Sequence, residues 1–207
     1  MFVTSVDATE PPRRLTLPET RPIFGVWPVD DSTLIIRTDN QAPGRGDILL
    51  VRMGVDTTVT PLVAGPAQEV TPSLSPNGRW LAYTSDESGV DEVYVRPFPR
   101  ATGGVFKISR AGGNEPRWSG TGSELFFRDG SGTMVSVRVE TASTFRVLSQ
   151  QELFSALRFK SSTFGGQYDV TRDGQRFLMI DQVPPTTGSE MIAVLNWFTE
   201  LRAVVPQ

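Results

Sequence analysis

The 207-residue sequence contains neither cysteine nor histidine. Without cysteine there is no disulfide, no thiolate nucleophile and no cysteine-ligated zinc or iron–sulfur site. Without histidine, the commonest general base near neutral pH and the commonest transition-metal ligand are both missing. The two absences argue against an enzyme, and we expect no catalytic residue, no cofactor and no metal in this chain.

Long hydrophobic runs and concentrated charge are also missing. The longest apolar runs, such as Ile48–Val51, are far shorter than the roughly 20 residues of a membrane helix. The first residues lack the basic and apolar regions of a signal peptide. Lys and Arg number 20 against 23 Asp and Glu, and no stretch collects them into a basic stripe. We therefore expect a soluble, unexported chain that inserts into no membrane and binds no nucleic acid.

What the sequence does contain is a repeated strand–turn–strand pattern, with 16 Pro and 19 Gly spread along the chain. Each copy is a short strand, a tight polar turn and an apolar strand rich in Ile, Leu, Phe or Tyr. The steps between equivalent turn positions are 47, 44 and 52 residues. Blades of β-propellers repeat about every 40 to 50 residues. The copies are Val26–Ile36, Ser73–Tyr83, Arg117–Phe127 and Asp169–Met179.

The turns of these copies carry hairpin residues. Asn77-Gly78 and Asp173-Gly174 predict two-residue type I′ turns, which need a positive φ at both central residues. Thr121-Gly122 keeps only the glycine, and Asp30-Asp31 keeps only the Asx character, so the first copy is degenerate.

A third and a fourth strand follow the hairpin in several copies, as in Val93–Val95 and Phe106–Ile108. Four antiparallel strands per unit are typical of a propeller blade. The sequence therefore predicts an all-β protein, a β-propeller of about four blades plus part of a fifth, with a short C-terminal helix at Asn196–Val205. The expected units are the outer strands of an incomplete blade at 1–21, blades at 22–66, 67–112 and 113–160, and the last blade with the helix at 161–207.

The segment PSLSPNGRWLAYTSDESGVDEVYV closely resembles the repeat of TolB-like, WD-repeat-like bacterial β-propellers, and EPRWSGTGSELFF is similar to a second copy in which Gly120 replaces the proline of the family. YDVTRDGQRFLM resembles a divergent last copy. The closing stretch IAVLNWFTELRAVVP resembles the end of propellers fused to bacterial serine/threonine kinases. The resemblance implies the fold and a role as a sensor or interaction domain, and hardly constrains the ligand.

The first residues are similar to the two outer strands of a preceding blade, at Phe2–Val6 and Arg14–Leu17. Two interpretations stay open. These strands complete the last blade and close a ring, or the chain is the tail of a longer propeller. An open stack of sheets would leave unpaired strand edges.

Binding-surface candidates lie near the strand ends and hairpin turns. Arg79, Arg117, Arg172 and Arg176 are placed to bind a carboxylate or phosphate bidentately at a rim or channel mouth. Trp80 follows the turn and is the best candidate for an exposed aromatic side chain.

Other residues are expected to be structural. Trp27 and Trp118 share one repeat position on the innermost strands and are expected in the core. The densest carboxylate cluster lacks the ligand alternation of a calcium loop, so we expect a solvated turn there. Its members are Asp86, Glu87, Asp91 and Glu92.

The leading functional hypothesis is a non-catalytic binding scaffold with a protein or peptide partner. By resemblance it is the sensor or interaction propeller of a larger bacterial signalling or envelope protein, whose kinase activity would lie in a missing N-terminal domain. The alternatives are a propeller hydrolase or hydrolase-gating fragment with a channel site, and a self-assembling piece that pairs through its edges. A membrane-anchored parent would place the propeller outside the cytoplasm; otherwise a cytoplasmic location is expected.

Overall fold

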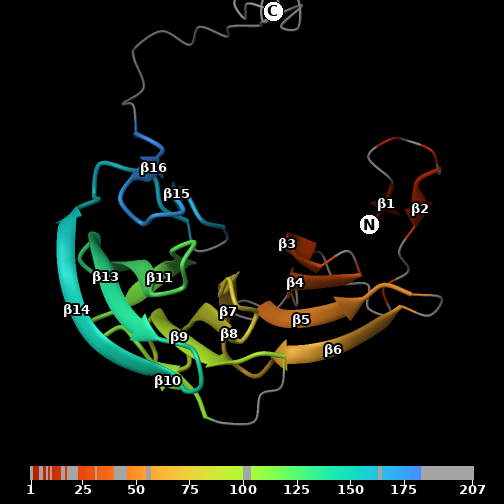
Figure 1. Ribbon diagram of the computed structural model, residues 1–207, viewed down its shortest axis with the longest axis horizontal. Coiled ribbons are helices and arrows are strands. Elements are labelled where there is room, and N and C mark those ends of the chain that lie inside the picture. Colours follow the sequence, from red (N-terminus) through yellow and green to blue (C-terminus); the bar gives the residue numbers. More distant parts are fainter. Residues whose placement is uncertain are drawn as a thin grey trace, which may run out of the picture.

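The computed structural model describes residues 2–4, 7, 9, 11–14, 17, 23–30, 32–39, 46–54, 57–99, 104–162 and 165–182. Every regular element among these residues is a β-strand. The predicted C-terminal helix at Asn196–Val205 lies outside the described residues. Figure 1 shows the sheets following one another round an arc, with the first strand of each on the concave side.

Three four-stranded antiparallel sheets form most of the arc, each a meander in which consecutive strands pair. The first sheet contains β3 (Ile23–Asp30), β4 (Thr33–Asp39), β5 (Gly46–Arg52) and β6 (Thr58–Val63). The second contains β7 (Glu69–Leu74), β8 (Trp80–Ser85), β9 (Glu92–Pro97) and β10 (Phe106–Lys107). The third contains β11 (Gly113–Trp118), β12 (Glu124–Asp129), β13 (Thr133–Glu140) and β14 (Arg146–Ser155).

Two short hairpins occupy the ends of the arc in Figure 1. At one end β15 (Tyr168–Val170) pairs with β16 (Phe177–Met179), and at the other β1 (Phe2–Val3) pairs with β2 (Arg13–Arg14). Among the described residues β2 pairs with β1 alone, and Leu17 packs against the core of the first sheet. The fold is therefore an all-β propeller with four-stranded antiparallel blades, as the repeat predicts.

The alternation of side chains along each second strand explains how the sheets stack. Leu81 and Tyr83 of β8 face the first sheet, whereas Trp80 and Ala82 of the same strand face the third. Successive residues of a strand point to opposite faces, so a strand buried on both faces carries a continuous apolar run, as Trp80–Tyr83 does. The core is therefore divided into layers between neighbouring sheets rather than gathered in one centre. A hydrogen bond also joins the second and third sheets directly, since Trp118 Nε1 donates to the Ser73 carbonyl at 3.0 Å.

The repeated turns are tight, but the predicted type I′ geometry is wrong. Gly78 has a φ of 66° and its N–H donates to the Ser75 carbonyl at 2.8 Å, while Asn77 does not have a positive φ. Pro76 fixes a negative φ at the first central position, so the turn is of type I with the glycine after it in the left-handed region. The same Gly-to-hydroxyl-residue hydrogen bond recurs from Gly122 to Ser119 and from Gly174 to Thr171.

The hydroxyl residue that opens each turn explains why the repeat begins with Ser or Thr. Ser75 Oγ accepts the Trp80 N–H at 2.9 Å and donates to Asn77 Oδ1 at 2.8 Å. Thr171 Oγ1 does the same with the Arg176 N–H at 3.0 Å and Asp173 Oδ1 at 2.6 Å. One short side chain thereby satisfies backbone donors that the turn leaves without a strand partner.

Replacing Gly78 by Ala tests the turn geometry. A methyl group there would meet nothing within 4 Å, so the expected cost comes only from the positive φ. We expect a loss of about 1 kcal/mol in the free energy of unfolding, measured by urea denaturation. Gly165→Ala is the matched control, because its site is equally open and has no positive φ; an equal loss in both variants would contradict the argument.

Candidate functional site

The four predicted arginines lie near turns and strand ends, and three of them, Arg79, Arg117 and Arg172, make separate contacts. The Arg79 guanidinium donates to the Ala142 carbonyl in the third sheet. Arg172 packs over Gly120, and Arg117 packs against Gly166. The contacts are so close that a Cβ added at either glycine would collide with the arginine. Arg79, Arg172 and Arg176 are exposed and Arg117 is half-buried. Among the described contacts none joins two of these arginines, so the structure does not gather them into one anion site.

Trp80 is not an exposed aromatic, contrary to the expectation. Its side chain is 8% exposed and lies in the core between the second and third sheets, against Phe106 and Phe145. Its Nε1 donates to the Thr141 carbonyl at 3.0 Å. The residue after the turn faces the neighbouring sheet, so the turn position that suggested exposure instead places the ring at a sheet-to-sheet contact. Trp118 is buried as expected, and the side chain of Trp27 lies outside the described residues.

The carboxylate cluster is only partly a solvated turn. Glu87 is exposed, but Glu92 is 2% exposed and is held by Lys107 Nζ at 2.7 Å and by the Ser109 hydroxyl. Burial, with Asp86 nearby, raises the pKa of Asp91. No group of three or more acidic side chains able to hold a metal ion occurs in the part of the chain that the structure describes.

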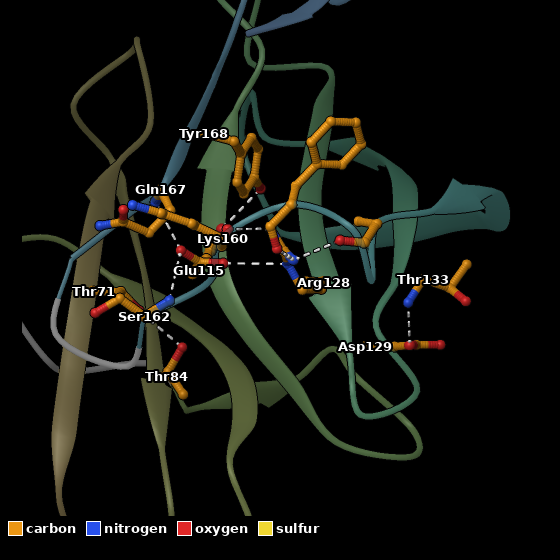
Figure 2. A network of polar contacts seen from close by, with 12 residues as sticks. Thr71, Thr84, Glu115, Arg128, Asp129, Thr133, Lys160, Ser162, Gln167 and Tyr168 are labelled. Atoms are coloured by element: carbon orange, nitrogen blue, oxygen red, sulfur yellow. Dashed lines mark hydrogen bonds and ion pairs between the residues drawn. The ribbon is translucent and has the colours of Figure 1, made fainter. Parts of the chain in front are cut away.

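A buried ion pair forms the joint between the third sheet and the β15–β16 hairpin (Figure 2). Arg128 Nε lies 3.3 Å from Glu115 Oε2, and both side chains are almost fully buried. The Arg128 guanidinium also donates to three carbonyls of the connection that leads to β15, at 3.0 to 3.1 Å. These carbonyls belong to Ala156, Phe159 and Lys160.

The carboxylate of Glu115 holds the same connection from the other side. Glu115 Oε1 accepts the Gln167 N–H at 2.7 Å and the Ser162 N–H at 3.3 Å. The Tyr168 hydroxyl donates to the Glu115 carbonyl at 2.8 Å. Burial raises the pKa of Glu115 even though the Gln167 N–H and Arg128 favour the ionised form. Every contact of the pair with the described residues is internal, so this network is a structural joint rather than a ligand site.

Sequence reasoning missed this joint, although a signal for it is present. Thr71 and Glu115 precede prolines at one repeat position, and both have a positive φ, of 49° and 55°. The register of the strand pairing shifts at each, as in a β-bulge. In the second sheet Thr71 bonds Thr84 at 2.9 Å, hydroxyl to hydroxyl, where the third sheet has Glu115 and Arg128. The repeated residue–proline pair in the innermost strand marks a bulge, and in the third sheet the side chain of the bulged residue, Glu115, reaches the joint.

A cavity of about 620 Å³ lies between the first and second sheets. One wall is the end of β6 and the connection that follows it, Pro61–Ala67. The other wall contains Glu69, Tyr83 and Arg96 of the second sheet, with Asp86 and Glu87 of the β8–β9 turn. Its size is in the range of ordinary ligand pockets.

Glu69 is the distinctive group of this cavity. It is 4% exposed, and its Oε2 atom makes no hydrogen bond to the described residues. Burial, together with Asp47, Asp86 and Glu87, raises the pKa of Glu69 to about 7. A buried carboxylate without a donor is costly to ionise, and such perturbed groups gather at functional sites. This acidic cavity, lined by Glu69 and the residues named above, is the candidate binding site.

The regular elements of the described residues are all β-strands. No helix there is long and apolar enough to cross a membrane. The turn hydroxyls of Ser75 and Ser119 are taken up in hydrogen bonds to backbone and neighbouring side chains.

The stacked four-stranded sheets define a β-propeller scaffold. More particularly, the chain has a TolB-like β-propeller fold: it is similar to TolB from Acinetobacter baumannii over 89% of its length, with a TM-score of 0.60 and 16% sequence identity. It spans 43% of the length of that TolB chain. A functionally unknown protein from Desulfotomaculum acetoxidans matches 87% of the chain and is itself covered over 69%, at 12% identity and a TM-score of 0.43. The sequence matches no protein-family model and no curated protein.

Proposed function

We propose that this chain is a non-catalytic protein-interaction scaffold, made of blades of a larger propeller. The observation that carries the proposal is the acidic cavity, in which the carboxylate of Glu69, a residue only 4% exposed, faces the space between two sheets and its Oε2 atom has no hydrogen-bond partner among the described residues. A propeller holds its blades rigidly and leaves binding to the surfaces and loops between them. A preformed site on a rigid frame suits recognition, because little conformational freedom is lost on binding.

The composition supports binding rather than catalysis. With no histidine and no cysteine in the sequence, a serine nucleophile would have to be activated by a lysine or a carboxylate. Lys107 is engaged with Glu92, and the turn serines are engaged with the backbone. A propeller hydrolase or hydrolase-gating fragment stays an alternative hypothesis, and no contact among the described residues favours it.

The parent protein is proposed from the sequence resemblance. A bacterial envelope or receptor-kinase-like protein would carry this segment as its sensor or interaction domain, and outside the cytoplasm if the parent is membrane-anchored. Edge-mediated self-association stays a second prediction, supported by the exposed apolar residues Leu178 and Ile180 on and beside β16, which are 76% and 48% exposed.

Site-specific photo-cross-linking tests the proposed function. A benzophenone amino acid replaces Val105, which lines the acidic cavity and is 50% exposed, in cells of the source organism. We expect a discrete cross-linked protein species. The same probe at Leu148, which is 58% exposed on the outer strand β14, should give no such species. Absence of a protein adduct at Val105, or the same adduct at both positions, would overturn the proposal.

A further inference from the structure

We infer that the acidic cavity binds a protonated amine or guanidinium carried on an apolar stem, supplied by a lysine or arginine side chain of the partner protein. This inference rests on the proposed function and names the chemistry that its site recognises. It stands on the shape, burial and charge of the cavity between β6 and the second sheet.

The walls of the cavity fit an apolar stem. Pro61, Leu62 and Val63 lie on one side, Pro66 belongs to the connection that follows, and Val105 approaches from the second sheet. Such walls contact methylene groups favourably, because apolar surface leaves water on both partners. A bare Ca²⁺ ion would gain nothing from them and needs six to eight oxygen ligands, whereas no group of three or more acidic side chains able to hold a metal ion occurs among the described residues.

The carboxylate of Glu69 fits the charged end of the ligand. It is nearly buried and its Oε2 atom lacks a donor among the described residues. A buried charge is tolerated when it is paired and hydrogen-bonded. An ammonium or guanidinium group brings both the opposite charge and several N–H donors, so it would satisfy Glu69 in a way that no described residue does.

The other charges around the cavity favour a cation. Asp86 and Glu87 line it, and Asp47 lies near enough to raise the pKa of Glu69. Asp86 Oδ1 accepts the Gln68 N–H at 2.7 Å, which fixes that carboxylate at the mouth. Arg96 is the single basic residue among those that line the cavity, beside Tyr83. Among the lining residues, the carboxylates of Glu69, Asp86 and Glu87 outnumber the one guanidinium. The resulting negative potential attracts a cation and repels an anion.

Binding of a cation to Glu69 must be linked to its proton. The pKa of Glu69 is about 7, so roughly a tenth of the molecules are ionised at pH 6 and roughly nine-tenths at pH 8. A cation binds the ionised form of Glu69, so its binding displaces the carboxyl proton of Glu69 into solution. The affinity should therefore rise about ten-fold from pH 6 to pH 8, which is opposite to the effect of a ligand that binds the protonated carboxyl.

An NMR titration with defined probes tests the inference. The first probe is a short acetylated and amidated alanine peptide with one central lysine, and the second replaces that lysine by norleucine, which keeps the stem without the charge. We expect the lysine peptide to shift resonances of Pro61–Ala67 and Glu69, more tightly at pH 8 than at pH 6. Equal binding of the norleucine peptide, or an affinity that does not change with pH, would overturn the inference.

A matched pair of variants locates the charge. Glu69→Gln keeps the shape and should weaken lysine-peptide binding at pH 8 at least ten-fold, whereas Glu152→Gln removes an exposed carboxylate of β14 and should leave it unchanged. A free diamine is the third probe. Weaker binding of the diamine than of the peptide supports a protein side chain as the source; equal binding keeps the cation and overturns that source.

The two proposals fail separately. A protein adduct at Val105 that persists unchanged in Glu69→Gln would overturn the cation inference and leave the scaffold standing. Lysine-peptide binding without any adduct in cells would overturn the protein-interaction role and leave the cation site standing.

Discussion

Replacing Arg128 by Met should destabilise the protein by about 3 to 5 kcal/mol, the largest effect we expect from a single substitution. The change removes a guanidinium that faces Glu115 at 3.3 Å and donates to three carbonyls of the connection to β15. Methionine matches the length of the stem but supplies no donor. Glu115 would then be a buried carboxylate without its counter-charge, and the three carbonyls would lose their partners.

Chemical denaturation in urea measures this effect through the midpoint of unfolding. Arg146→Met is the matched control, since Arg146 also pairs with a carboxylate, Glu140, at 2.6 Å but with both side chains well exposed. Exposed ion pairs contribute at most about 1 kcal/mol to stability, so the unfolding midpoint of the control variant should barely change. Adding Glu115→Gln to Arg128→Met should recover part of the loss because it removes the stranded charge. A loss below about 1 kcal/mol for Arg128→Met would contradict the role of the joint.

The propeller fold could be predicted because its information is local and repeated. The hydroxyl residue, the turn glycine and the following apolar strand recur at Ser75, Ser119 and Thr171, and each is fixed by contacts within a few residues. The alternation in β8 also follows from strand geometry alone, since neighbouring residues must face opposite sheets. The predicted type I′ turn is wrong because each turn begins one residue earlier, as at Ser75, so that Pro76 and Asn77 are its central residues and the glycine follows them.

The sites could not be predicted in the same way, because they form between elements that are distant in sequence. Glu69 looks like any charged residue at the start of a strand, and its burial depends on β6 and on Asp86 and Glu87 beyond the next hairpin. The predicted exposure of Trp80 is wrong for the same reason, because the ring is covered by Phe145 of the next sheet. The Glu115–Arg128 pair could have been predicted from the repeat. Arg37, Thr84 and Arg128 share one repeat position, and all three are buried. A buried arginine recurring in a repeat indicates a polar joint.

Glu69 should also make the stability of the protein depend on pH in a direction opposite to that of most carboxylates. Burial, with Asp47, Asp86 and Glu87 nearby, raises its pKa from 4.5 to about 7, so the folded protein holds this proton more tightly than the unfolded chain does. The stabilising effect of the proton is complete below about pH 4.5. It is lost as the pH rises through about 7, where the buried carboxylate ionises although its Oε2 atom has no hydrogen-bond donor among the described residues.

Glu69→Gln isolates this contribution, because glutamine has the same shape and never ionises. The free energy of unfolding is measured in urea for both proteins at pH 5 and at pH 8. We expect the stability of the variant relative to the natural protein to rise by roughly 2 to 3 kcal/mol from pH 5 to pH 8. Glu152→Gln, an exposed carboxylate, should stay within about 0.5 kcal/mol of the natural protein at both. A Glu69→Gln variant that is less stable at pH 8 would mean that the ionised carboxylate is already satisfied in the folded protein, and the acidic cavity would then hold no unmet charge for a cation to pair.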